Sequence, residues 1–430
     1  MANSSNSKKR RGNPSSGASS GASGPSGRTA GAASGGGSVG KSGGTDAGMR
    51  GGTAGDVDAG TFGGMAGGTA GGKADGTFSG KAYGASGDAT DNLGRFSGLR
   101  RILFTLSGLF VLFLIWLFRP GDPMPEITLP PAFPQPGFTV ESAHEAVRQR
   151  ELASGPLRPD NHARIIWNNE YRDRQAPCSI VYIHGFTASY GEGDPVHARL
   201  ARDLGCHLYV SRLHGHGLRT GDPLGDMQPD SLMADAAHAL AIGGLLGEKV
   251  VLAGNSMGGI LSLYLASAFP DRVDALLLFA PLLDFATPGA RFFNRAWTQR
   301  IAELVMGGPY LTFEPANDGH ARYWYTHYRM EAVGILESMR HDLISDTLYA
   351  SITHPVFTGY YYKDEDNRDE VVSLSAILEF KDKLGTPPDQ REFHAFPNAG
   401  AHVITSAYRS EEYDKVRHEA ARFLREQLFD

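Results

Sequence analysis

The chain has 430 residues and a formal net charge of −6, but its composition is uneven, because residues 1–98 hold 29 of the 55 glycines and carry +4. The remaining residues carry −10, which disfavours nucleic acid as a partner. With only two cysteines, the chain cannot form a disulfide-rich scaffold or a four-cysteine metal site.

Residues 1–98 consist mainly of Gly, Ser, Ala and Thr, with very few large apolar side chains. Such a segment buries too little apolar surface to offset the entropy lost on ordering. Its short glycine motifs follow no solenoid or collagen period. We therefore predict a disordered tail.

An apolar segment follows the tail. Residues 102–118 contain no charge and are mostly Leu, Phe, Ile and Val, and this run reaches the lower limit for a membrane-spanning helix. A cleavable signal peptide is the alternative, but its apolar stretch is usually shorter and a small-residue cleavage site follows it. Here the run ends in Phe118-Arg119-Pro120. We predict an uncleaved, single-pass transmembrane anchor at residues 99–119.

The cations that flank this segment predict its orientation. Arg95, Arg100 and Arg101 precede it closely, whereas Arg119 is the only cation after it before Arg148. By the positive-inside rule, the N-terminus lies in the cytoplasm and the C-terminal domain on the outer, periplasmic or extracellular, side. The anchor makes the lipid bilayer a partner of this chain.

A proline-rich spacer is predicted at residues 120–137, which contain seven prolines. Such segments favour a semi-rigid, extended polyproline conformation. The spacer would hold the following domain off the bilayer.

Strand-like and helix-like segments then alternate through one domain, residues 138–430. Short apolar runs of strand length lie at residues 164–167, 179–183, 207–213, 249–253, 275–279, 355–362 and 392–396. Helical periodicity is found at residues 231–246, 259–269 and 411–428. This alternation predicts an α/β fold with a mainly parallel sheet flanked by helices. Residues 284–352 interrupt it with a long aromatic-rich stretch, which we expect to be an inserted helical cap.

The sharpest motif is Gly254-Asn255-Ser256-Met257-Gly258, between a β-branched strand and a helix. A serine at the tip of such a turn has a strained backbone, and side chains two residues away on either side would collide. We predict Ser256 as a nucleophile and the Met257 N–H as an oxyanion donor. Acyl transfer needs a second backbone donor, and the His184-Gly185-Phe186 turn after another strand offers the Phe186 N–H.

With these two motifs the chain resembles the α/β-hydrolase superfamily over about residues 160–428, in particular esterases and monoacylglycerol lipases with a His-Gly-Phe oxyanion loop. Residues 212–217 look like the family's Arg-Leu-Pro-Gly-His-Gly loop, with His214 in place of the proline. His214 and His216 have no carboxylate or cysteine at ligand spacing, so we interpret this loop as a pocket edge and expect no metal.

The resemblance implies a triad in the order Ser, Asp, His. Asp369 fits the family pattern of Asp, any residue and two β-branched residues, whereas Asp364, which lies nearer the end of the preceding strand, remains the alternative acid. His402, in Gly-Ala-His-Val after the last strand, resembles the family's Gly-x-His-Val loop and is the expected base. The resemblance implies no cofactor.

The sequence thus predicts a membrane-anchored serine hydrolase that cleaves small-molecule carboxylic esters, such as acylglycerols or other lipid-like esters, through an acyl-enzyme. One alternative is a proline-iminopeptidase-like peptidase, since the same triad cleaves amides. The other is a catalytically silent hydrolase fold that serves as a binding module.

Cys178 and Cys206 begin two strands that we expect to be parallel neighbours. Their spacing would permit a disulfide. However, free cysteine is a common small core residue, and adjacent parallel strands seldom direct two side chains suitably. We therefore expect free thiols.

Overall fold

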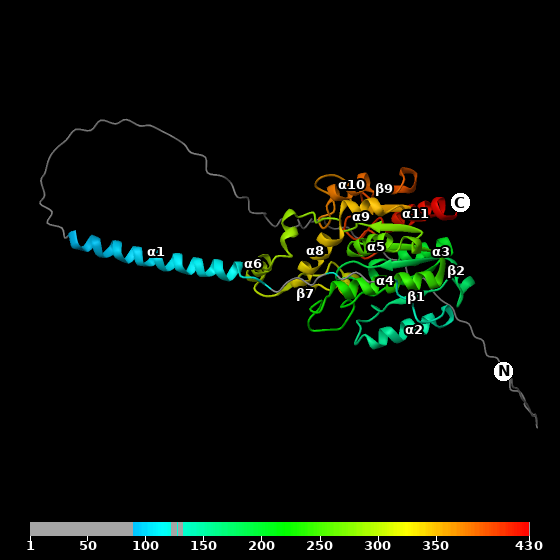
Figure 1. Cartoon of the computed structure of the whole chain (residues 1–430), viewed down its shortest axis with the longest axis horizontal. Coiled ribbons are helices and arrows are strands. Elements are labelled where there is room, and N and C mark those ends of the chain that lie inside the picture. The colour runs from blue at the N-terminus through cyan, green and yellow to red at the C-terminus, as the bar shows by residue number, and fades with distance from the viewer. Residues whose placement is uncertain (1–88, 122–126, 128–131, 430) are drawn as a thin grey trace, which may run out of the picture. The chain divides into compact units, whose positions relative to one another are not determined.

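The computed structural model describes residues 89–121, 127 and 132–429 (Figure 1). Nearly all of the predicted tail and half of the predicted proline-rich spacer lie outside these residues. Helix α1 (Ala89–Phe118) covers residues 99–118 of the predicted anchor, and its Gly98–Phe118 portion has 21 residues with a mean hydropathy of 2.2. By length and composition, this portion is long and apolar enough to cross a membrane.

The domain is built on a seven-stranded sheet that contains all seven predicted strands. Its strand order is β1-β3-β2-β4-β5-β8-β9. Only β1 is antiparallel to its neighbour, and the other pairs are parallel, so the prediction of a mainly parallel sheet is confirmed. The strands are β1 (Arg164–Ile166), β2 (Ala176–Ile183), β3 (His207–Val210), β4 (Gly247–Asn255), β5 (Ala275–Phe279), β8 (Val356–Tyr360) and β9 (Arg391–Ala395).

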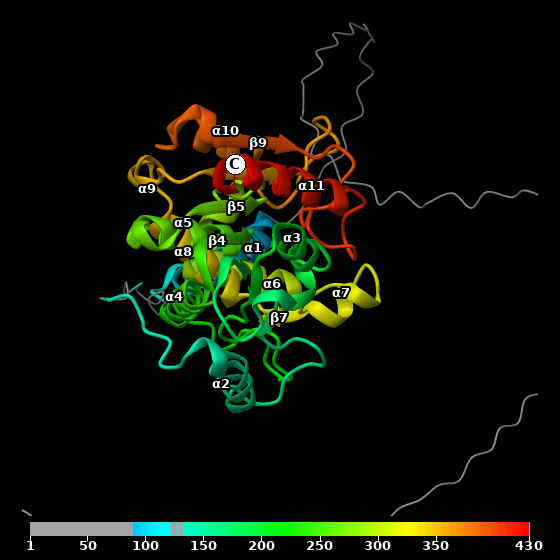
Figure 2. The same cartoon turned by 90° about the vertical axis from the view of Figure 1, so that its right-hand side faces the viewer.

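Helices cover both faces of this sheet, with α4 and α5 on one side and α3 on the other (Figure 2). The alternation of strand side chains explains this arrangement. In β2, Val181 and Ile183 join the core under α4 and α5, whereas Ile180 and Tyr182 join the core under α3 and α11. The flanking helices are α2 (Val140–Ala153), α3 (Val196–Leu204), α4 (Pro229–Leu246), α5 (Met257–Ala268), α10 (Leu374–Lys383) and α11 (Tyr413–Leu424).

The insertion between β5 and β8 differs in two ways from the helical cap expected at residues 284–352. It includes a two-stranded antiparallel sheet, and its helix α8 packs into the main core through Ile335, Leu336 and Met339. Strands of three residues each are too short to give a period-two pattern, so the sequence did not reveal them. The insertion holds α6 (Ala296–Met306), β6 (Tyr310–Thr312), α7 (Asp318–Tyr323), β7 (His327–Arg329), α8 (Glu331–Leu343) and α9 (Asp346–Ser351).

Short helical turns join several of these elements. The 3₁₀ turns are η1 (Asn169–Tyr171), η2 (Tyr190–Glu192), η3 (Pro270–Arg272), η4 (Pro288–Phe292) and η5 (Pro388–Gln390), and the π turn η6 (Arg425–Phe429) follows α11.

Cys178 and Cys206 form a disulfide, so the expectation of free thiols was wrong. Because β2 and β3 pair with Ser179 opposite His207, the two preceding residues face each other across the strands. Their Cα atoms are 4.7 Å apart, within the range that a disulfide spans. Both side chains belong to the core beneath α3 and α11.

Candidate active site

Ser256 occupies the sharp turn between β4 and α5, with φ +53° and ψ −114°. A positive φ is rare for residues other than glycine and marks local strain. The turn is held from β5, because the Ser256 N–H donates to the Phe279 carbonyl at 3.0 Å. This bond to β5 helps to fix the conformation of the turn.

The two glycines of the motif are required by close backbone approach. A Cβ atom on Gly254 would collide with the Gly258 carbonyl, and one on Gly258 would collide with the Ile183 carbonyl at the end of β2. The steric reason inferred from the sequence therefore holds, and the second glycine also lets α5 begin directly against β2.

Asp369 and His402 lie together, as the triad prediction requires. His402 Nδ1 is 2.7 Å from Asp369 Oδ2. The other carboxylate oxygen accepts the N–H groups of Val371 and Val372, at 2.8 and 3.1 Å, and the Asp369 side chain is only 4% exposed. These bonds fix the carboxylate and hold the imidazole with Nδ1 toward it.

Asp364, the alternative acid, is engaged elsewhere. Its Oδ1 accepts the backbone and side-chain N–H groups of Asn367 at 2.9 and 2.7 Å, and these bonds hold the pKa of this exposed carboxyl below its ordinary value. Asp364 therefore closes its own turn, whereas Asp369 contacts His402.

The remaining imidazole nitrogen, His402 Nε2, is buried and has no hydrogen-bond partner among the described residues. Since Nδ1 faces Asp369, Nε2 is the nitrogen available to Ser256, and the two groups are not hydrogen-bonded to each other in the described part of the chain. Such bonds are often long in unliganded hydrolases and tighten when substrate binds.

The two expected oxyanion donors flank the nucleophile. Met257 is the first residue of α5, where backbone N–H groups and the helix dipole favour negative charge. Phe186 follows Gly185, and this glycine lies close to the nucleophile, because a Cβ atom built on it would be 3.1 Å from the Ser256 Cβ. Neither the Phe186 nor the Met257 N–H donates a hydrogen bond within the described residues, so both remain available to a ligand.

The insertion supplies a wall beside this loop. The ring of Phe186 meets Tyr328 of β7 edge-on, with centroids 5.3 Å apart. Tyr328 is itself buried and contacts Phe313. Aromatic side chains from the insertion therefore border the oxyanion loop.

The motif histidines His184 and His216 are structural. His184 Nδ1 lies 2.9 Å from the Gly185 carbonyl, and its Nε2 accepts the Leu213 N–H at 3.0 Å. Burial lowers the pKa of His184 to about 4 and moves that of His216 in the same direction, so both rings are neutral at pH 7. The loop after β3 thus supports the oxyanion loop through the bond from the Leu213 N–H to His184.

Glu192 is a functional candidate that the sequence analysis missed. Its Oε2 accepts the Gly185 N–H at 2.7 Å, directly before the expected donor Phe186. The only sequence signal for this role is a glutamate seven residues after Gly185, in a turn rich in glycine and aromatic residues. That signal does not reveal that the side chain is buried, which is unusual for a glutamate.

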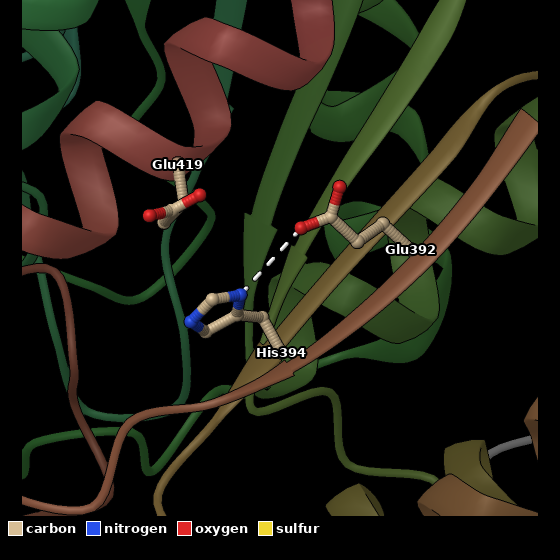
Figure 3. Close-up of side chains that lie close together, drawn as sticks. All are labelled: Glu392, His394 and Glu419. Carbon is tan, nitrogen blue, oxygen red and sulfur yellow. Dashed lines mark ion pairs between the residues drawn. The ribbon is translucent and has the colours of Figure 1, made fainter.

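A group of possible metal ligands lies on β9 and α11, where Glu392, His394 and Glu419 place ligand atoms within 4.8 Å of one another (Figure 3). Arg422 already neutralises the negative charge of the two glutamates, because it donates to both oxygens of Glu392, at 2.6 and 2.7 Å, and to Glu419 at 3.1 Å. This guanidinium takes the place that a cation would fill, so the cluster does not indicate a metal site.

Several solved structures are similar to this chain. The structure reported for the metagenome-derived lipolytic enzymes LipS and LipT matches with a TM-score of 0.51 and 18% identity, over 63% of this chain and 99% of that one. The monoacylglycerol lipase of Paleococcus ferrophilus matches with a TM-score of 0.47 and 16% identity, over 62% of this chain and 98% of that one. A soluble variant of monoglyceride lipase from Saccharomyces cerevisiae matches with a TM-score of 0.47 and 13% identity, over 62% of this chain and 91% of that one.

The sequence model of the alpha/beta hydrolase family matches residues 180–416, more than half of the chain. This range runs from β2 into α11 and includes the Ser256 turn, Asp369 and His402. The chain therefore belongs to the alpha/beta hydrolase family.

Proposed function

We propose that this protein is a membrane-anchored serine hydrolase that cleaves carboxylic esters, with Ser256, Asp369 and His402 as its catalytic triad. Two observations carry the proposal: the 2.7 Å contact between His402 and the buried Asp369, and a serine held at positive φ in the turn between β4 and α5. These residues supply the three groups that a catalytic triad needs: a base, an orienting carboxylate and a nucleophilic hydroxyl.

In the acylation step, His402 Nε2 takes the proton of the Ser256 hydroxyl while Oγ bonds to the ester carbonyl carbon. The carbonyl oxygen becomes an oxyanion, which accepts the N–H groups of Phe186 and Met257. When the tetrahedral intermediate collapses, the bond to the leaving oxygen breaks, and His402 protonates the departing alcohol. The acyl group remains on Ser256.

In the deacylation step, water takes the place of the alcohol. His402 removes a proton from the water, whose oxygen attacks the acyl carbon, and the same two N–H groups stabilise the second oxyanion. Collapse releases the carboxylic acid and returns the proton to Ser256. Asp369 stabilises the imidazolium that forms in each step.

Two features favour lipid-like esters. Helix α6 exposes apolar side chains, with Leu304 63% and Val305 76% exposed. The first half of α6 contacts the end of α1, because Arg300 donates to the carbonyls of Leu117 and Arg119 at 2.8 and 2.6 Å. An exposed apolar face next to an anchor helix is suited to the interface of a bilayer, where acylglycerols reside.

The disulfide favours placement of the catalytic domain outside the cytoplasm. Disulfides persist in oxidising compartments and are rare in the cytosol. The bond between Cys178 and Cys206 therefore agrees with the orientation inferred from the arginines that precede the apolar run of residues 102–118. We infer a single-pass protein with a cytoplasmic N-terminus and its hydrolase domain on the outer side.

Labelling with a fluorophosphonate, together with a substrate series, tests this proposal. We expect wild-type protein to label and to hydrolyse p-nitrophenyl esters and monoacylglycerols, and Ser256→Ala to lose both activities with a nearly unchanged Tm. Aminoacyl amides with N-terminal proline serve as the comparison. Turnover of the amides alone would indicate the peptidase, and absence of labelling would indicate a silent binding module.

A further inference from the structure

Glu192 is a buried acid that connects the three segments of the proposed active site. It ends the turn η2 and is only 1% exposed. Its Oε2 accepts the Gly185 N–H at 2.7 Å, and its backbone carbonyl accepts the Thr405 hydroxyl at 2.9 Å. It thus contacts the oxyanion loop before Phe186 and the loop that follows His402.

The third connection is to the serine turn. The side chain of Asn255, the residue before Ser256, is fully buried, and its two polar atoms have no hydrogen-bond partner among the described residues. A Cβ atom on Gly185 would lie 2.8 Å from Glu192 Oε1 and 3.1 Å from the Asn255 carbonyl. Gly185 therefore lies close to both the Glu192 carboxyl and the serine turn, so the position of this carboxyl bears on how the oxyanion loop packs against that turn.

We propose that Glu192 is a positioning residue that holds the Phe186 N–H against the Ser256 turn, and that it does so as a neutral, protonated acid. This inference rests on the proposed ester hydrolysis. Glu192 is separated from the reacting atoms by Gly185 and Asn255, so it acts through the backbone that these residues carry.

The surroundings explain why the neutral form is favoured. No cation pairs with Glu192 among the described residues, and burial raises the pKa of its carboxyl to about 8 although the hydrogen bonds from Gly185 and Tyr182 partly oppose that shift. Two titratable groups pack nearby. The Tyr182 hydroxyl of β2 lies 3.3 Å from Glu192 Oε2, and the His197 ring of α3 packs edge-on against the Tyr182 ring. Burial raises the pKa of Tyr182 and lowers that of His197 to about 3, so both are uncharged at pH 7.

A neutral acid also suits the chemistry. A carboxylate close behind the oxyanion loop would repel the negative charge that forms on the substrate, and such repulsion is strong where water is excluded. A protonated carboxyl accepts the Gly185 N–H without adding that charge. As pH rises through about 8, ionisation of Glu192 should therefore lower kcat.

The test compares Glu192→Gln, which is neutral and similar in shape, with Glu192→Ala, which removes the support. On a soluble p-nitrophenyl ester at pH 7, we expect Glu192→Gln to keep kcat within about threefold and Glu192→Ala to lower it about 10–100-fold with little change in KM, since loss of one oxyanion donor costs about 10²–10³. Above pH 8, kcat of the wild type should fall, whereas kcat of Glu192→Gln should not.

The control for this experiment is the variant Glu337→Gln. Glu337→Gln removes another fully buried carboxyl, which pairs with Arg340 in α8, and should leave kcat unchanged. Wild-type kcat in folded Glu192→Ala, or an unchanged alkaline decline in Glu192→Gln, would overturn the positioning role. If Glu192→Ala does not fold, the pH profile of Glu192→Gln decides. Failure of the wild type to label at Ser256 would overturn the proposed function itself.

Discussion

Ser256 and its neighbours show how one strained residue depends on the backbone around it. Its positive φ is maintained by the bond from its N–H to Phe279 and by two glycines that no other residue can replace without collision. These requirements are local, so the serine, its glycines and the histidine loop could be recognised from short motifs. The role of Glu192 could not, because it depends on burial among segments far apart in the sequence.

The acid of the triad is open to a direct comparison. We expect Asp369→Asn to lower kcat by about 10⁴-fold, because loss of the carboxylate leaves the imidazole in the wrong tautomer. Asp364→Asn should change kcat less than threefold, since Asp364 binds only within its own turn. Steady-state kinetics on one p-nitrophenyl ester measure both variants, and the reverse ranking would transfer the role to Asp364.

At the scale of elements, short apolar runs located every strand of the main sheet, with ends that differ by a few residues. The run at residues 207–213 is strand only to Val210, because Ser211 and Arg212 already begin the loop that supports His184. The sequence did not reveal that α8 belongs to the core. Its apolar residues look the same whether they cover an active site or pack under α4 and α5.

Helix α6 provides a prediction about substrate delivery. Leu304→Glu combined with Val305→Glu places charge on its most exposed apolar positions and should weaken contact with a bilayer. We expect hydrolysis of monoacylglycerol in phosphatidylcholine vesicles to fall at least fivefold, whereas turnover of p-nitrophenyl acetate should stay unchanged.

The matched control for this experiment is Glu303→Gln, which alters an exposed polar position of the same helix. It should behave as wild type on both substrates. Equal losses on the soluble and the vesicle substrate would indicate damage to the catalytic site, and an unchanged vesicle rate would remove α6 from membrane contact.

At the scale of the whole molecule, the proposed topology separates a cytoplasmic tail from an exported hydrolase. Protease added to intact cells or spheroplasts should digest residues 138–430 and spare an epitope tag at the N-terminus, because only the part beyond α1 is accessible. Immunoblots for the tag and the domain give the readout, with detergent-lysed cells as the positive control. A hydrolase domain protected from protease would contradict the orientation.

The disulfide should contribute measurably to stability. It closes a segment of 28 residues, and restriction of the unfolded chain by a loop of that length contributes about 3–4 kcal/mol. We expect reductant to lower the Tm of the hydrolase by several degrees and to have no effect on a Cys178→Ser, Cys206→Ser double variant. Thermal denaturation with and without dithiothreitol measures this difference, and equal Tm values for wild type would contradict it.

The position of this cross-link has a consequence for biosynthesis. The segment that it closes contains Gly185, Phe186 and Glu192, so the loop that would hold the oxyanion is tied at its base to β2 and β3. In the reducing cytosol a newly made chain would lack that tie. Under the proposed topology, the domain would therefore reach its full stability only after export.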